Sequence, residues 1–211
     1  AHQLRTPLTG IRWSFQELLE GTAGKLNKGQ HKIIKDALGA AIRTINLIND
    51  LLNVARIEGG RFGFSMQTLS LASFLQKEIP RFIKQAEEKG IKLDMNLAKD
   101  LPLSNFDPEK TVVVLEDLLD NAIKYTSPGG KIAVRVFQTE KFIRTEVEDT
   151  GIGIPKDQQR FIFSKFFRAD NALVLQTAGS GLGLYLVKNI IEKQGGSLGF
   201  KSEENKGSIF W

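Results

Sequence analysis

Two glycine-rich stretches contain the residue types with which a protein can hold a nucleotide. The first follows a strand-like run and is Asp149-Thr150-Gly151-Ile152-Gly153-Ile154-Pro155. It sets a carboxylate beside two glycines that let a ligand approach the backbone. The second stretch precedes a run with helical periodicity and is Gly179-Ser180-Gly181-Leu182-Gly183-Leu184. Backbone amides at the start of a helix favour anions such as phosphates. Taken singly, each stretch is more often an ordinary turn than a ligand site.

The spacing excludes the commoner nucleotide motifs. Leu184 stands where the dinucleotide fingerprint requires its third glycine, and the Gly-Lys-Ser/Thr of a P-loop does not occur. The signatures of protein kinases are also missing. The formal net charge of +5 is scattered along the chain. Nucleic-acid binders instead gather basic residues in a stripe, so we expect no nucleic-acid partner.

A predicted helix over residues 109–125 adds polar groups suited to phosphates. Asp117, Asn121 and Lys124 are spaced three and four apart, which places them on one helix face, and Tyr125 follows at its edge. An amide oxygen is a Mg²⁺ ligand, a lysine meets phosphate as a point charge, and a tyrosine ring packs along a base. Standing alone, these residues would be read as a solvated polar face.

Five motifs in order resemble those of the sensor histidine kinases of two-component systems. Residues 120–126 resemble the asparagine box of the histidine-kinase-type ATPases, residues 149–155 and 179–184 their two glycine boxes, and residues 161–168 their phenylalanine box. Residues 1–8, Ala-His-Gln-Leu-Arg-Thr-Pro-Leu, resemble the histidine phosphoacceptor box. Order and spacing agree across nearly the whole of residues 61–211. The chain is therefore identified as a member of that family.

The resemblance implies an ATP site with Mg²⁺. Asp149 would bind the adenine amino group, and Asn121 would hold Mg²⁺ between the phosphates. Lys124 and Arg168 would neutralise phosphate charge, Tyr125 and Ile154 would flank the base, and residues 155–178 would form a mobile lid. The complete expected ATP-binding set is Asp117, Asn121, Lys124, Tyr125, Asp149, Gly151, Gly153, Ile154, Arg168, Gly179, Ser180, Gly181, Leu182, Gly183 and Leu184.

The resemblance also implies the chemistry of the first helix. His2 would attack the γ-phosphorus of ATP, and the phosphate would then pass to an Asp of a response regulator receiver domain. Thr6 matches a position that helps a water molecule to dephosphorylate that partner. Gln3 stands where the family usually has an acid. Its amide oxygen can orient the imidazole of His2 but brings no negative charge. Asp117, where the family often has Asn, would strengthen Mg²⁺ binding or repel metal-free phosphate.

Two helices over residues 1–58 must position His2. In the second, apolar residues alternate in steps of four and three through three heptads: Ile34, Leu38, Ala41, Ile45, Ile48, Leu52 and Ala55. That spacing predicts a bundle or coiled-coil seam. Two helices alone cannot bury both of their seams, so we expect a homodimer in which two all-α hairpins form a four-helix bundle. Gly59 and Gly60 end the second helix, and residues 59–61 form the predicted hinge.

Residues 62–211 predict a second domain of mixed composition, the ATP-binding catalytic domain. Strands are expected at 62–66, 91–96, 131–138, 142–148, 197–200 and 208–211, and helices at 71–88, 109–125 and 182–193. Residues 155–178 lack steady periodicity and read as a long connection. Strands and helices do not alternate regularly, which favours an α+β sandwich with a mixed sheet and helices on one face. The resemblance implies that this is the Bergerat-type ATP-binding fold.

Composition fits a globular catalytic core. Hydrophobic residues make up 41% and charged residues 25% of the chain, and cysteine is absent, which excludes disulfides and thiolate metal sites. Both ends look cut, so we expect a fragment of a longer protein. We expect a cytoplasmic catalytic core, with any membrane contact made through parts of the parent that are not present here. Two alternatives remain open. One is a dimeric scaffold that binds ATP but is catalytically weak because of Gln3. The other is a chaperone or topoisomerase ATPase, against which the histidine box argues.

Overall fold

The computed structural model describes residues 2–98, 100–176 and 179–211, and for residues 2–5 it describes the backbone alone. The chain divides into two compact units, residues 1–62 with 178–180 and residues 63–177 with 181–211. Among the described residues, no helix has the length and apolar character needed to cross a membrane.

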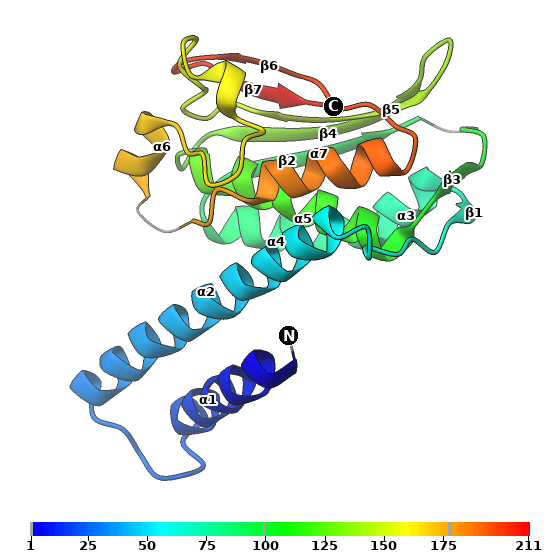
Figure 1. The fold of residues 1–211 in the computed structure, drawn as a ribbon. Coiled ribbons are helices and arrows are strands. Elements are labelled where there is room, and N and C mark those ends of the chain that lie inside the picture. Colours follow the sequence, from blue (N-terminus) through cyan, green and yellow to red (C-terminus); the bar gives the residue numbers. More distant parts are fainter. Residues whose placement is uncertain (1, 99, 177–178) are drawn as a thin grey trace. The chain divides into compact units, whose positions relative to one another are not determined.

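The first unit is a helical hairpin. Helices α1 (His2–Glu20) and α2 (Lys28–Glu58) lie side by side (Figure 1). A capping box begins α2: the Asn27 side chain accepts a hydrogen bond from the Gln30 amide, and the Gln30 side chain accepts one from the Asn27 amide. The helix ends where the sequence predicts, because Gly60 adopts φ +64° and Arg61 N donates back to Arg56 O.

The second unit is a mixed sheet covered by helices on one face, as the sequence predicts. Its strand order is β2-β4-β5-β7-β6, with β2 parallel to β4 and every other pair antiparallel. Figure 1 shows α4, α5 and α7 beneath this sheet. The elements of this sheet and its covering helices are α4 (Pro80–Glu88), β2 (Lys92–Leu97), α5 (Pro108–Tyr125), β4 (Lys131–Gln138), β5 (Ile143–Asp149), α7 (Gly183–Lys193), β6 (Phe200–Glu203) and β7 (Gly207–Phe210).

The core between sheet and helices fixes where α5, α7 and the end of β5 lie. Its most buried members in these three elements and in β4 are Leu119, Ile123, Ile132, Val134, Val136, Val147, Leu186, Val187 and Ile190. Each is at most 2% exposed. Burying a branched aliphatic side chain contributes about 1.5–3 kcal/mol, so this layer holds the three elements in fixed register.

Two predicted elements near the start of the second unit are wrong. Residues 62–66 form no strand, because Ser65 N donates to the Asp107 carboxylate instead of to a strand partner. The strand β1 (Gln67–Leu69) follows and pairs with β3 (Ser104–Phe106), which the sequence analysis missed. The single helix expected at 71–88 is two, α3 (Leu71–Glu78) and α4, because Pro80 has no amide hydrogen and begins a new helix.

The long connection contains regular structure that its lack of periodicity did not predict. A 3₁₀ turn, η1 (Gln159–Phe161), and a short helix, α6 (Asp170–Leu175), lie within residues 155–176. Ile162, Ala169 and Ala172 are buried there, whereas Val174 is 88% exposed. The segment therefore has a packed base and an exposed end.

Candidate functional site

The end of α5 lies against the turn that follows β5. Ile152 N donates to Tyr125 O at 3.1 Å. A Cβ atom at Gly151 would lie 2.5 Å from the same carbonyl oxygen, which is closer than side-chain carbons approach. A residue with a side chain at 151 would therefore push the turn away from α5. The asparagine-box helix and the first glycine-rich turn form one surface.

Asp149 is a buried carboxylate at the start of that turn. It ends β5, is 9% exposed, and accepts hydrogen bonds from the Gly151 amide at 2.8 Å and from the Ser208 amide. Burial raises the pKa of Asp149 to about 6, and the two amide bonds only partly offset this effect. A buried carboxylate whose pKa lies near neutrality is typical of a ligand site. Asp149 can accept a hydrogen bond from an adenine amino group.

The β6–β7 turn holds the first glycine-rich turn from the other side. Gly153 has φ +62°, and a Cβ atom there would collide with Glu203 O. Ile154 N donates to the Ser202 hydroxyl at 2.9 Å. The turn is therefore fixed before any ligand arrives, which reduces the ordering cost of binding.

The second glycine-rich stretch opens α7 beside α5. Leu182 is fully buried, and a Cβ atom at Gly183 would lie 2.8 Å from Asp117 Oδ1. Gly181 lies against Phe166 of the phenylalanine box, and Leu184 is half-buried. Residues 181–184 therefore lie beside the polar face of α5. Gly179 and Ser180 group with the first unit, so their place in this site stays a prediction.

Two cations from different elements lie near each other. Burial lowers the pKa of Lys124, and the positive charge of Arg168 lowers it further; Asp120 acts in the opposite direction. The Arg168 guanidinium donates to the carbonyls of Ala172, at 3.3 Å, and Gln176. Repulsion between two nearby cations raises the free energy of the ligand-free protein, and a bound polyanion would offset it by attracting both. This pair is suited to phosphate oxygens.

Two oxygen donors on α5 suit a hard divalent cation. Asp117 and Asn121 are one helical turn apart, and both are half-buried. Within residues 2–98, 100–176 and 179–211, no three His, Cys, Asp or Glu side chains gather into a metal cage. Mg²⁺ commonly uses one or two protein ligands and completes its shell with phosphate oxygens and water, so this donor set fits it.

The predicted phosphoacceptor residues lie in the hairpin. The side chains of His2 and Gln3 fall outside the described residues, although the helix α1 begins at His2. Thr6 is exposed on α1. Their predicted roles therefore remain predictions.

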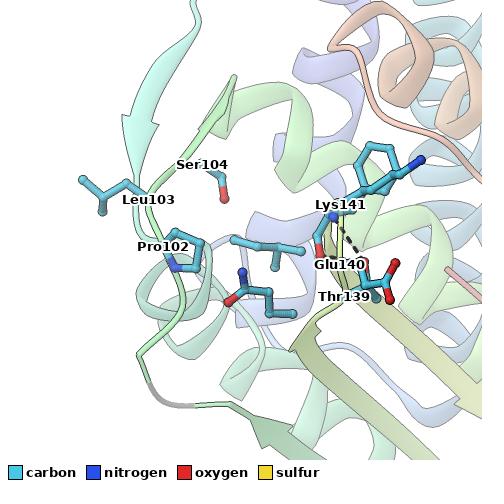
Figure 2. Close-up of a pocket in the computed structure, with 9 residues that line it drawn as sticks. Pro102, Leu103, Ser104, Thr139, Glu140 and Lys141 are labelled. Carbon is cyan, nitrogen blue, oxygen red and sulfur yellow. Dashed lines mark hydrogen bonds between the residues drawn. The ribbon is translucent and has the colours of Figure 1, made fainter.

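The side chains that hold the first glycine-rich turn lie outside the predicted set of site residues. Ser202 and Gln159 bind the backbone of Ile154, and Asn171 binds the carbonyl of Gly153. Polar residues in short strands and turns carry no spacing signal, so only the strand register could have identified them. A hollow of about 310 Å³ lies elsewhere, between residues 102–104 and the β4–β5 hairpin (Figure 2). None of the expected site residues lines it.

Family models match both units. Residues 1–60 match the "His Kinase A (phospho-acceptor) domain", and residues 106–211 match the "Histidine kinase-, DNA gyrase B-, and HSP90-like ATPase" family.

Curated relatives and a solved structure agree with these models. The circadian input-output histidine kinase CikA of Synechococcus elongatus is 33% identical over the whole chain, and the sensor protein SrrB of Staphylococcus aureus is 32% identical. The chain spans 28% and 36% of the length of these two proteins. The crystal structure of full-length ShkA in complex with AMPPNP superposes with TM-score 0.79 and 28% identity, covering all of this chain and 43% of ShkA.

The joint match of a phosphoacceptor model and an ATPase model within one chain agrees with the five ordered motifs. The chain belongs to the histidine kinase-, DNA gyrase B- and HSP90-like ATPase family, and its first unit matches the phospho-acceptor domain of histidine kinases.

Proposed function

We propose that this chain transfers the γ-phosphate of ATP to His2 and then to an Asp of a response regulator receiver domain. The observation that carries the proposal is the convergence of Asp149, the Lys124–Arg168 pair and the start of α7 in a chain that also matches the phosphoacceptor model. Residues 1–58 are the proposed dimerisation and phosphoacceptor domain, 59–61 the hinge and 62–211 the catalytic domain. Dependence on ATP makes the cytoplasm its proposed location.

The nucleotide residues act by position and charge. The Asp149 carboxylate accepts a hydrogen bond from adenine, and Tyr125 and Ile154 flank the base. Lys124 and Arg168 neutralise phosphate charge as it moves toward the leaving oxygen. Asn121 and Asp117 would hold Mg²⁺, which supplies further neutralisation across the phosphates when bound. The amides at the start of α7 add the favourable field of a helix N-terminus.

The transfer step uses the neutral imidazole of His2. Its nitrogen lone pair forms the N–P bond while the bond from phosphorus to the bridging oxygen breaks and ADP leaves with that electron pair. Gln3 is proposed to accept a hydrogen bond from the other ring nitrogen and so fix the tautomer. The receiver carboxylate later takes the phosphoryl group and restores neutral histidine. Thr6 is proposed to orient a water for dephosphorylation of the receiver.

The test is incubation with γ-labelled ATP and Mg²⁺ followed by acid and base treatment of the protein. Phosphohistidine is acid-labile and base-stable, so label with that behaviour supports the kinase. Binding of ATP without any label would favour the scaffold alternative instead.

The dimer is proposed from the face that the hairpin leaves uncovered. The predicted seam of α2 is partly buried against α1 in one chain, but a second stripe stays exposed. Its large members are Ile33, Leu47 and Leu51, which are 70%, 39% and 40% exposed. The stripe runs through Ile33, Ala40, Thr44, Leu47 and Leu51. Its spacing follows the four-three alternation of a helix interface. A second hairpin packed on this stripe would complete a four-helix bundle.

Leu51→Asp should convert a dimer into monomer or aggregate, because each copy would bury an unpaired charge in the interface. Asn46→Asp is the matched control, since Asn46 is exposed on α2 and none of its neighbours one helical turn away belongs to either stripe. Light scattering at micromolar concentration measures the mass of both variants. A monomeric wild-type protein, or a dimeric Leu51→Asp variant, would contradict the bundle.

Asp117→Asn should loosen the dependence of nucleotide binding on Mg²⁺. The carboxylate lies at the opening of α7, where it repels metal-free phosphate and attracts a cation. We expect metal-free ADP to bind about fivefold more tightly and Mg-ADP to bind a few-fold more weakly, each corresponding to ~1 kcal/mol. Calorimetry with ADP, in EDTA and in excess Mg²⁺, gives both constants. Equal Mg²⁺ dependence in the two proteins would exclude a role for Asp117 in metal binding.

A further inference from the structure

The base of the lid is tied to the first glycine-rich turn by a side chain outside the family motifs. The Nδ2 amide of Asn171, in the first turn of α6, donates to Gly153 O at 3.0 Å and more weakly to Ile152 O at 3.4 Å. Asn205 N donates to the same Ile152 carbonyl at 2.7 Å. The two carbonyls of the turn are therefore held between α6 and the β6–β7 turn.

A neighbouring pair strengthens the same attachment. Gln158 Nε2 donates to Asp170 Oδ2 at 2.7 Å, and Asp170 N donates to Gln158 Oε1 at 3.0 Å. Ala169 and Ala172 on either side are buried. The start of α6 is thus fixed onto residues 152–158, whereas the end of α6 is exposed: Leu173, Val174 and Leu175 are 43%, 88% and 50% exposed.

We propose that Asn171 is a positioning residue for the nucleotide, which fastens the base of the lid to Ile152 and Gly153 and holds the adenine side of the pocket in shape. This inference rests on the proposed ATP site. Asn171 touches neither reacting atoms nor phosphates in this role. Its Oδ1 is buried and, among the described residues, accepts no hydrogen bond, so the donating amide alone fixes the side chain.

In this proposal, Asn171 marks the boundary between two parts of the lid, one that stays in place and one that moves when nucleotide binds. Residues 155–171 belong to the wall of the adenine pocket and keep their place without nucleotide. The part that rearranges on binding begins at Leu173, where α6 becomes exposed, and the Arg168 guanidinium holds the carbonyls of Ala172 and Gln176. Arg168 would exchange these carbonyls for phosphate, so lid movement and phosphate neutralisation would be coupled.

Asn171→Asp tests the attachment with almost no change of shape, because a carboxylate cannot donate to the two carbonyls and repels them. Asn189→Asp is the matched control. Asn189 is also a half-buried asparagine whose amide donates to a backbone carbonyl, that of Tyr185 at 2.8 Å. This bond lies within α7 and does not involve the first glycine-rich turn. Asn171→Ala removes the donor without adding charge and serves if the Asp variant unfolds. Thermal unfolding checks all three folds.

Calorimetry with Mg-ADP and Mg-GDP gives the affinity and the base preference. Asn171→Asp should bind Mg-ADP about tenfold more weakly and lose part of its preference over Mg-GDP, while Asn189→Asp stays within about twofold of wild type. Without nucleotide, limited trypsin digestion should cut Asn171→Asp faster than wild type after Lys156, Arg160 and Lys165, which are all exposed in the lid base. Unchanged Mg-ADP affinity in both Asn171 variants overturns the proposal. A wild-type protein that binds no Mg-ADP would instead overturn the ATP site itself.

Discussion

Asp149→Asn should weaken binding of Mg-ATP about tenfold or more while making the ligand-free protein more stable at pH 7. The two effects have one cause, which is the buried carboxylate. An amide oxygen can still accept the Gly151 amide bond, but the variant presents an NH₂ group where adenine needs an acceptor. A buried donor facing a donor loses about 1–3 kcal/mol, which corresponds to the expected loss of affinity.

The gain in stability follows from the raised pKa of Asp149. The folded protein keeps the proton up to about pH 6, whereas the unfolded chain releases it near the ordinary value of 3.8. The folded state therefore binds more protons between these pH values, and wild-type stability falls as pH rises through this window. Replacing the carboxylate removes that penalty, which is roughly 1–3 kcal/mol at pH 7. Thermal unfolding at pH 7 and pH 4 should show the variant's advantage at pH 7 only.

Wild-type ATP binding should respond to pH in the opposite direction. A protonated carboxyl is the weaker acceptor, so affinity should rise as pH increases through about 6. The Asp149→Asn protein should lack this step. Equal affinity of the two proteins at pH 7 in calorimetry would refute the assignment of Asp149 to adenine. An intact circular dichroism spectrum and unchanged mass control for misfolding.

Elements with a clear period and a single buried face were predictable from sequence. The strand β4 was expected at the residues where it lies, because Ile132, Val134 and Val136 alternate with polar residues. The break between α3 and α4 was not predicted, since Leu75, Ile79, Phe82 and Ala86 keep the four-three spacing across Pro80. The apolar pattern reports a common buried face and not the continuity of the backbone. Strand β3 has three residues and no period to detect.

The site likewise contains residues that were predictable from the sequence and residues that were not. Its contiguous boxes were visible because chemistry-bearing residues stand close together in sequence. The residues that support them come together only through the sheet: β5 pairs with β7 so that Asp149 faces Ser208, and β7 pairs with β6 so that Ser208 faces Ser202. More than fifty residues separate Asp149 from Ser202. Their contribution depends on strand register, which the sequence alone did not provide.

His2→Gln should abolish autophosphorylation, while His31→Gln should leave it unchanged. The chain has two histidines, and His31 is exposed on α2 without the flanking phosphoacceptor motif. Glutamine keeps the approximate size and polarity of the side chain but offers no nucleophilic ring nitrogen. The measurement is the time course of acid-labile, base-stable label at saturating Mg-ATP. Label that persists in His2→Gln and disappears in His31→Gln would transfer the phosphoacceptor role to His31.

The neighbour Gln3 sets the expected rate of that reaction. A neutral amide orients the imidazole but does not stabilise the positive charge that develops as the N–P bond forms. Gln3→Glu should therefore raise the rate roughly five- to tenfold, since a charge-assisted hydrogen bond exceeds a neutral one by about 1 kcal/mol. Gln3→Ala should be slower than the native sequence, because the imidazole loses its acceptor altogether. If neither substitution changes the rate, Gln3 does not activate His2, and another base must take the imidazole proton. Label that appears only in Gln3→Glu would instead assign the native chain to the ATP-binding scaffold alternative.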